Sequence, residues 1–162
     1  MTVTDTTTNL EELTLTFVTE FDAPAEKVWT VWADPRKLER WWGPPTWPAT
    51  FVRHEFVPTG AARYYMTGPD GTRAHGWWTI TAIEAPYRLE FDDGFANADG
   101  EPIDADRPMH AVVTLDETGG TTRMTVVSHF PDVDTLERQL KMGMQEGMRL
   151  ALGQIDQILS NS

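Results

Sequence analysis

Apolar and small residues recur at spacings of three and four near the end of the chain, from about Asp134 to Leu159. This spacing predicts one amphipathic helix, which at roughly 1.5 Å per residue would be about 38 Å long. The stripe consists of Leu136, Leu140, Gly143, Met144, Gly147, Met148, Ala151, Leu152, Ile155, Ile158 and Leu159. Such a helix needs a broad apolar surface to cover it, so the preceding residues are expected to form a sheet.

The first regular pattern is an alternation of apolar and polar residues from Leu13 to Phe21, which predicts a half-buried strand. Two short helices are expected next. Asp22 is the predicted cap of the first, and Asp34, followed by proline, is the predicted cap of the second, which ends near Trp41. Three prolines in residues 41–48 then exclude a helix and predict a rigid aromatic loop.

Six further strands are predicted between turn sequences, at residues 50–57, 61–67, 73–84, 88–95, 109–117 and 121–130. Residues 97–107 are polar and acidic and are expected to form a loop. Consecutive strands joined by tight turns favour an antiparallel sheet, which would pack one apolar face against the helix. The fold class predicted from the pattern is therefore α+β, with about seven strands and a long C-terminal helix.

The length of 162 residues fits one domain, expected at residues 13–160 after a flexible segment at residues 1–12. The 25 acidic against 13 basic side chains, a formal charge of −12, argue against nucleic acid or an anionic membrane as a partner. The chain has no cysteine, so disulfides and thiol chemistry are excluded. The first dozen residues have neither the basic start nor the apolar core of a signal peptide, and no run approaches 18 apolar residues, so a cytoplasmic protein without a membrane span is expected.

Several short motifs, in order, resemble the START-like (SRPBCC) superfamily, and most closely its branch named after the C-terminal domain of the activator of Hsp90 ATPase. They are Ala23-Pro24-Ala25-Glu26-Lys27-Val28-Trp29, Asp34-Pro35, Trp41-Trp42-Gly43-Pro44, Pro58-Thr59-Gly60-Ala61, Gly68-Pro69-Asp70-Gly71, Ile83-Glu84-Ala85-Pro86-Tyr87-Arg88-Leu89, Gly120-Thr121-Thr122-Arg123 and Gly143-Met144-Gln145-Glu146-Gly147-Met148. The resemblance implies a helix-grip fold, in which a curved antiparallel sheet wraps the C-terminal helix and leaves a cavity between them. It implies no single function, because the superfamily includes lipid carriers, hormone receptors, cyclases and co-chaperones.

The expected function is binding of a small hydrophobic molecule in that cavity, as a carrier or sensor. Flat aromatic rings and adaptable methionines are typical of such pockets, and glycines on the inner helix face would leave space for a guest. Because neighbouring strand residues point to opposite faces, only one of Trp77 and Trp78 can face inward. The candidate ligand-binding residues are Trp41, Trp42, Tyr65, Trp78, Met144, Gly147 and Met148.

Two other functions stay open: an enzyme of cyclase or hydrolase type acting on a hydrophobic substrate, and a protein-interaction module of co-chaperone type. An inward-facing acid–base pair would favour the enzyme, whose candidate residues are Arg63, Tyr64, Tyr65, His75 and Glu90. No cofactor is expected, no metal site is predicted from the four scattered histidines, and the acidic run from Asp92 to Asp106 lacks the spacing of a calcium loop. A homodimer is left open.

Overall fold

The computed structural model describes residues 3–103 and 107–160 and contains one eight-stranded antiparallel sheet. Its strand order is β1-β2-β8-β7-β6-β5-β4-β3. The strands are β1 Val3–Asn9, β2 Thr14–Phe21, β3 Ala49–His54, β4 Ala61–Thr67, β5 Arg73–Glu84, β6 Arg88–Ala96, β7 Met109–Thr118 and β8 Thr121–His129. The helices are α1 Ala25–Ala33, α2 Pro35–Leu38, α3 Val133–Lys141, α4 Met144–Leu152 and α5 Ile155–Ser160. The predicted α+β class and its antiparallel sheet are confirmed.

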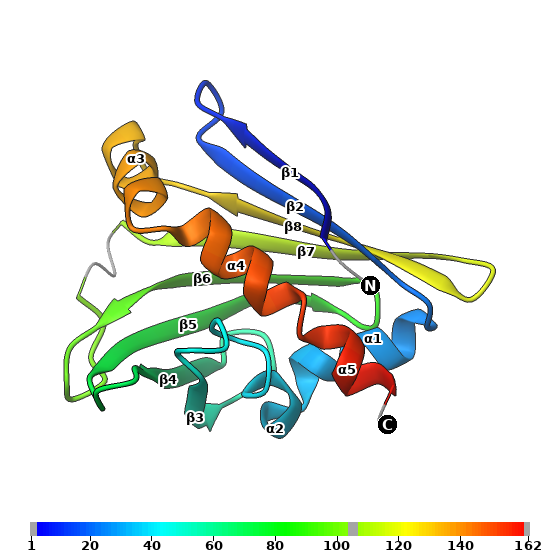
Figure 1. Ribbon diagram of the computed structural model, residues 1–162, viewed down its shortest axis with the longest axis horizontal. Coiled ribbons are helices and arrows are strands. Elements are labelled where there is room, and N and C mark those ends of the chain that lie inside the picture. Colours follow the sequence, from blue (N-terminus) through cyan, green and yellow to red (C-terminus); the bar gives the residue numbers. More distant parts are fainter. Residues whose placement is uncertain (1–2, 104–106, 161–162) are drawn as a thin grey trace.

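Figure 1 shows the helices at the end of the chain crossing one face of this curved sheet. Helix α4, drawn in orange, runs diagonally from α3 to α5, and α5 lies beside α1 at the far end of the sheet. This arrangement is the helix grip that the motif order implied. Across residues 3–103 and 107–160, no helix combines the length and the apolar character that crossing a bilayer requires.

Strand β1 lies where the sequence predicted a flexible segment, and it raises the strand count from about seven to eight. It pairs with β2 in antiparallel register, with Thr7 opposite Thr16. The turn between them is fixed by the Asn9 side chain, whose carbonyl oxygen accepts hydrogen bonds from the backbone amides of Glu11 and Glu12, each 3.0 Å long. Because β1 is an edge strand held by backbone hydrogen bonds, its threonine-rich sequence carries no apolar alternation to predict it.

The predicted C-terminal rod is divided into three helices. The first break is at Gly143, whose φ of +86° is left-handed and ends the hydrogen-bonding pattern of α3. The second follows Gly153, where the side-chain amide of Gln154 donates a 2.9 Å hydrogen bond to the carbonyl oxygen of Gly43. Gln154 thereby ties the helical segment to the aromatic loop of residues 41–48.

Both predicted short helices form, but α2 ends at Leu38 and not near Trp41, and only one of the two has the predicted cap. Asp34 accepts a 2.9 Å hydrogen bond from the backbone amide of Arg36 and so caps α2. Asp22 does not cap α1, which starts after Pro24. The first free amide of α1, on Ala25, instead donates a 2.7 Å hydrogen bond to Glu117 at the end of β7, so α1 is capped across the fold.

Aromatic rings fill the core between the sheet and α1. Trp78 on β5 stacks on Phe91 of β6 with ring centroids 4.1 Å apart, and Trp32 of α1 meets Trp41 edge to face at 4.7 Å. Offset and edge-to-face contacts of this kind stabilise a core beyond the area that they bury. This end of the molecule is therefore closely packed.

Candidate functional site

A cavity of about 500 Å³ lies between α4, the sheet and the aromatic loop. This volume falls in the range typical of small-molecule sites. Its walls come from the loop, β4 to β8, α3 and α4, and they are mainly apolar. The lining residues are Trp42, Gly43, Pro44, Trp47, Tyr64, Met66, Ala74, Phe91, Asp93, Phe95, Met109, Ala111, Val126, Ser128, Gln139, Met142, Gly143, Met144, Gly147, Met148 and Ala151.

The helical wall of the cavity is formed by glycines and methionines. A Cβ atom built on either Gly143 or Gly147 would meet no atom within 4 Å, so each glycine borders open space. Met144 and Met148 line the cavity one turn apart on α4. Three of the predicted residues, Met144, Gly147 and Met148, therefore lie together on one wall.

The loop wall is aromatic and held by close backbone approach. Trp42 is 7% exposed, and Trp47 lies between two glycines. A Cβ on Gly43 would come within 2.3 Å of the Trp47 carbonyl oxygen, and one on Gly68 within 2.7 Å of its ring. Gly43 also has a φ of +103°, which disfavours other residues. These two glycines position the indole beside the cavity.

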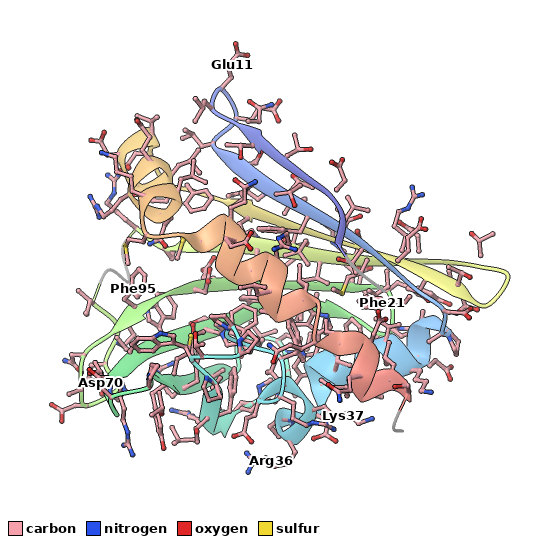
Figure 2. All side chains as sticks on the ribbon, viewed as in Figure 1. Glu11, Phe21, Arg36, Lys37, Asp70 and Phe95 are labelled. Atoms are coloured by element: carbon pink, nitrogen blue, oxygen red, sulfur yellow. The ribbon has the colours of Figure 1, made fainter. Side chains whose placement is uncertain are left out.

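The sheet wall carries two polar groups, Tyr64 on β4 and Asp93 on β6, which we call the polar pole. Tyr64 is paired with Gly76 of β5, and a Cβ on Gly76 would lie 2.4 Å from the tyrosine hydroxyl. The missing side chain lets the phenol extend across β5. Asp93 lies on the same face of the sheet as Leu89 and Phe91 and is half-buried. Figure 2 labels Phe95, the next residue on this face, at the left end of β6.

Enclosure changes the acidity of both groups. Burial, followed by the nearby charge of Asp92, raises the pKa of Asp93 to about 7, although His110 acts in the opposite direction. Asp93 is half-buried and lines the cavity, so its carboxyl group loses part of its hydration. Burial, with the charge of Asp93, also raises the pKa of Tyr64 above its usual range. Asp93 therefore changes protonation near neutral pH.

The indole N–H groups nearest this pole are unsatisfied. Those of Trp42 and Trp78 approach the Tyr64 hydroxyl closely enough to oppose the rise in its pKa. Neither has hydrogen-bonding geometry with any residue in the described part of the chain. Buried donors without partners are uncommon in folded proteins, so this corner of the cavity has unused hydrogen-bonding capacity.

Of the four predicted aromatic residues, Trp42 lines the cavity and the other three do not. Trp41 is fully buried, and its indole donates a 2.9 Å hydrogen bond to the carbonyl oxygen of Val31. Trp78 faces inward as one of its pair should, but it is fully buried in the aromatic core. Tyr65 points to the outer face, where the Arg73 guanidinium lies 4.2 Å from its ring centre. Its neighbour Tyr64 takes the inner position because alternate strand residues face opposite ways.

Sequence reasoning missed Asp93, although a signal for it exists. In β6, Leu89 and Phe91 are buried, and continuing their alternation by two residues puts Asp93 on the inner face. The intervening Glu90 and Asp92 lie outside, where they accept hydrogen bonds from His110 at 3.1 Å and 2.8 Å. The acidic cluster thus divides between the two faces of the sheet.

The outer cluster is an ion-pair network. His110, on β7, loses some basicity through burial, but its hydrogen bonds to Asp92 and Glu90 raise its pKa overall. Arg88 joins the network through a 2.8 Å contact with Glu90. Within residues 3–103 and 107–160, no group of three or more His, Asp or Glu side chains is placed to hold a metal ion. Asp104 and Asp106 of the predicted acidic loop lie outside the described residues.

Solved structures resemble this one over nearly the whole chain. A protein from Arthrobacter aurescens, solved by NMR, is 53% identical, with a TM-score of 0.94 over 99% of this chain and 94% of that one. A crystal structure of a Mycobacterium smegmatis protein is 43% identical, with a TM-score of 0.89 over 98% of both chains. A Silicibacter pomeroyi protein, 21% identical over 91% of this chain and 97% of that one, shares the fold with a TM-score of 0.72.

A search of curated proteins finds no match. The sequence profile described as "Activator of Hsp90 ATPase homolog 1-like protein" matches residues 22–160, which span α1 to α5 and every strand after β2. The helix-grip fold and these relatives agree with it. The chain belongs to the Activator of Hsp90 ATPase homolog 1-like family, within the START-like (SRPBCC) superfamily.

Proposed function

We propose that this protein binds a small hydrophobic molecule in the cavity between α4 and the sheet. Family membership supports either a ligand-binding module or one resembling Hsp90 activators. The observation that favours ligand binding is the cavity itself, about 500 Å³ with glycines opening its helical wall. A structural core would fill such a space, since protein interiors are closely packed.

The walls suit an apolar guest of variable shape. Five of the seven methionines line the cavity: Met66, Met109, Met142, Met144 and Met148. Their flexible thioethers can repack around different ligands, and the indoles of Trp42 and Trp47 add flat apolar area. A ligand that buries about 300 Å² of apolar surface would gain roughly 7 kcal/mol before the entropy of binding is subtracted. Micromolar binding is within reach of this gain.

Titration with Nile red, a neutral dye whose fluorescence rises in apolar surroundings, tests the proposal. The native protein should bind it, and Gly147→Leu should weaken binding at least about tenfold by filling the cavity. Gln145→Leu is the matched control, because Gln145 is exposed on the same helix and does not line the cavity. Equal affinity of all three folded proteins, or no binding by the native protein, would contradict the proposal.

A second candidate is an enzyme that moves a proton on the bound molecule, and Asp93 is the observation that favours it. A carboxyl group with a pKa of about 7 beside Tyr64 can act as general acid or base at neutral pH. Incubating the protein with an apolar ketone in D₂O, and following exchange at the carbon beside the carbonyl by NMR, tests this. Faster exchange with the native protein than with Asp93→Asn would support catalysis. Equal rates would contradict it, and ligand binding would then be the only proposed function.

A further inference from the structure

Four polar side chains interrupt the apolar walls: Tyr64, Asp93, Ser128 and Gln139. Asp93, Ser128 and Gln139 form no side-chain hydrogen bond or ion pair with the described part of the chain, and the Tyr64 hydroxyl is approached only by the indoles of Trp42 and Trp78. Ser128 and Gln139 are buried, and Asp93 is half-buried at the sheet wall. Polar groups enclosed in this way normally have partners, so their vacant hydrogen bonds are available to a bound molecule.

The lining contains no positive charge. Among the described residues, the cavity wall includes no lysine, arginine or histidine, and its one charged group is Asp93. The charged residues nearest to Asp93 in sequence and across the sheet are Asp92 and His110, which bond to each other on the outer face. A carboxylate ligand would therefore enter an acidic protein, lose its hydration and meet a second carboxyl group instead of a cation.

The polar pole combines complementary groups. The Asp93 carboxylate accepts hydrogen bonds, and the Tyr64 hydroxyl can both donate and accept them. A ligand hydroxyl can donate to Asp93 and accept from Tyr64 at the same time. A carbonyl group can only accept, so it leaves Asp93 without a donor, whereas an ammonium group can form an ion pair with the Asp93 carboxylate.

Building on the proposed function, we propose that the cavity selects neutral, hydroxyl-bearing apolar molecules over carboxylates of the same size, with the hydroxyl group between Asp93 and Tyr64. The apolar body then lies against the methionines of α4 and the indoles of the loop. This assigns the ligand class and its orientation: the polar end lies at the sheet wall and the apolar end towards α4.

The test compares four probes that share one ring system at pH 8: 2-naphthol, naphthalene, 2-naphthoate and 2-naphthylmethylamine. Affinities are measured by displacement of Nile red. The expected order places 2-naphthol first, several-fold tighter than naphthalene and about tenfold or more tighter than 2-naphthoate. If 2-naphthoate binds as tightly as 2-naphthol, or if the amine, which can form an ion pair with Asp93, binds no tighter than naphthalene, the proposal is overturned.

Two variants assign the preference to the pole. Tyr64→Phe should reduce 2-naphthol binding to the level of naphthalene, and Asp93→Asn should recover most of the lost 2-naphthoate affinity. Asp92→Asn is the matched control, since it removes the same charge one residue away on the outer face and should change each ratio less than about twofold. Equal loss of discrimination in Asp92→Asn would assign it to overall charge and contradict the proposal.

Naphthalene keeps this test separate from the proposed function. If naphthalene and Nile red both bind but the hydroxyl gives no advantage, the cavity binds ligands and only the assigned class is wrong. If neither binds to the native protein, the proposed function fails together with the inference. Retained naphthalene binding in each variant also shows that its cavity is still formed.

Discussion

The two ends of the C-terminal helical segment have similar sequence patterns but different structural roles. At its end, Leu152, Ile155 and Ile158 are buried against the core, and α5 lies beside α1. Earlier, along α4, Gly147 and the methionines on either side border open space. The same helical stripe therefore stabilises the fold at one end and leaves room for a guest at the other.

The difference comes from side-chain volume and from the helix breaks. Branched aliphatic residues occupy the stripe where α5 packs, whereas glycine occupies it where α4 passes over the sheet. Gly143 redirects the chain before α4, and Gln154 fastens its far end to the aromatic loop through Gly43. The helix is thus fixed at the packed end while its inner face stays open beside the sheet.

The largest expected effect is at the packed end. Leu152→Ala and Ile155→Ala should each lower the free energy of unfolding by about 2 to 5 kcal/mol, because both side chains are fully buried and their removal leaves a cavity. Met148→Ala, on the open side, should cost clearly less, since its side chain already borders empty space. Denaturant unfolding checks this. Equal losses at the three positions would show that the two ends pack alike.

A pH-dependent effect is expected at the open end. The pKa of Asp93 is raised to about 7, so the folded protein holds this proton more tightly than the unfolded chain. That contribution to stability is complete below about pH 4 and is lost as the pH rises through about 7.

The asparagine of Asp93→Asn cannot ionise, so this variant does not lose stability as the pH rises. Between pH 4 and pH 8, its free energy of unfolding should therefore rise by about 1 to 3 kcal/mol relative to that of the native protein. Urea unfolding at both pH values measures this double difference. A stability difference that does not change with pH would mean that Asp93 is well hydrated.

The smallest effects sharpen the description of α4 itself. Gly143 and Gly147 both face open space, but only Gly143 has a left-handed backbone. Gly143→Ala should destabilise the protein by about 1 to 2 kcal/mol, whereas Gly147→Ala should stabilise it by up to about 1 kcal/mol. Thermal unfolding of the pair decides this. Effects of the same sign would contradict the break at Gly143.

Most of the fold could be predicted because its signals are local. Alternation and turn residues identified seven strands, and Asp34 identified the start of α2. Strand β1 could not be predicted, because its exposed threonines carry no apolar face. The interruption at Gly143 was also hidden, since a glycine inside an apolar stripe at helical spacing does not reveal a left-handed backbone.

The candidate site was predicted in part, and the misses have physical reasons. The residues of α4 were found because helical spacing gives the direction of each side chain. Tyr65 was chosen where Tyr64 lines the cavity, and a shift of one residue on a strand moves the side chain to the other face of the sheet. Arg63 lies on the same face as Tyr65, and its charge could have marked that face as the outer one. The directions of Trp41 and Trp42 could not be predicted, because a loop has no period.

The most direct test of the cavity is a titration of the protein, labelled with ¹³C at its methionine methyl groups, with 2-naphthol followed by NMR. Five methionines line the cavity, and Met66, Met109, Met144 and Met148 are less exposed than Met142. Met124 is fully buried elsewhere, with the Trp32 indole nitrogen 3.3 Å from its sulfur. Ring currents from a bound naphthol should shift the methyl signals of these four less exposed methionines in a saturable way and leave Met124 nearly unchanged. Shifts confined to the exposed Met142, or none, would contradict a ligand between α4 and the sheet.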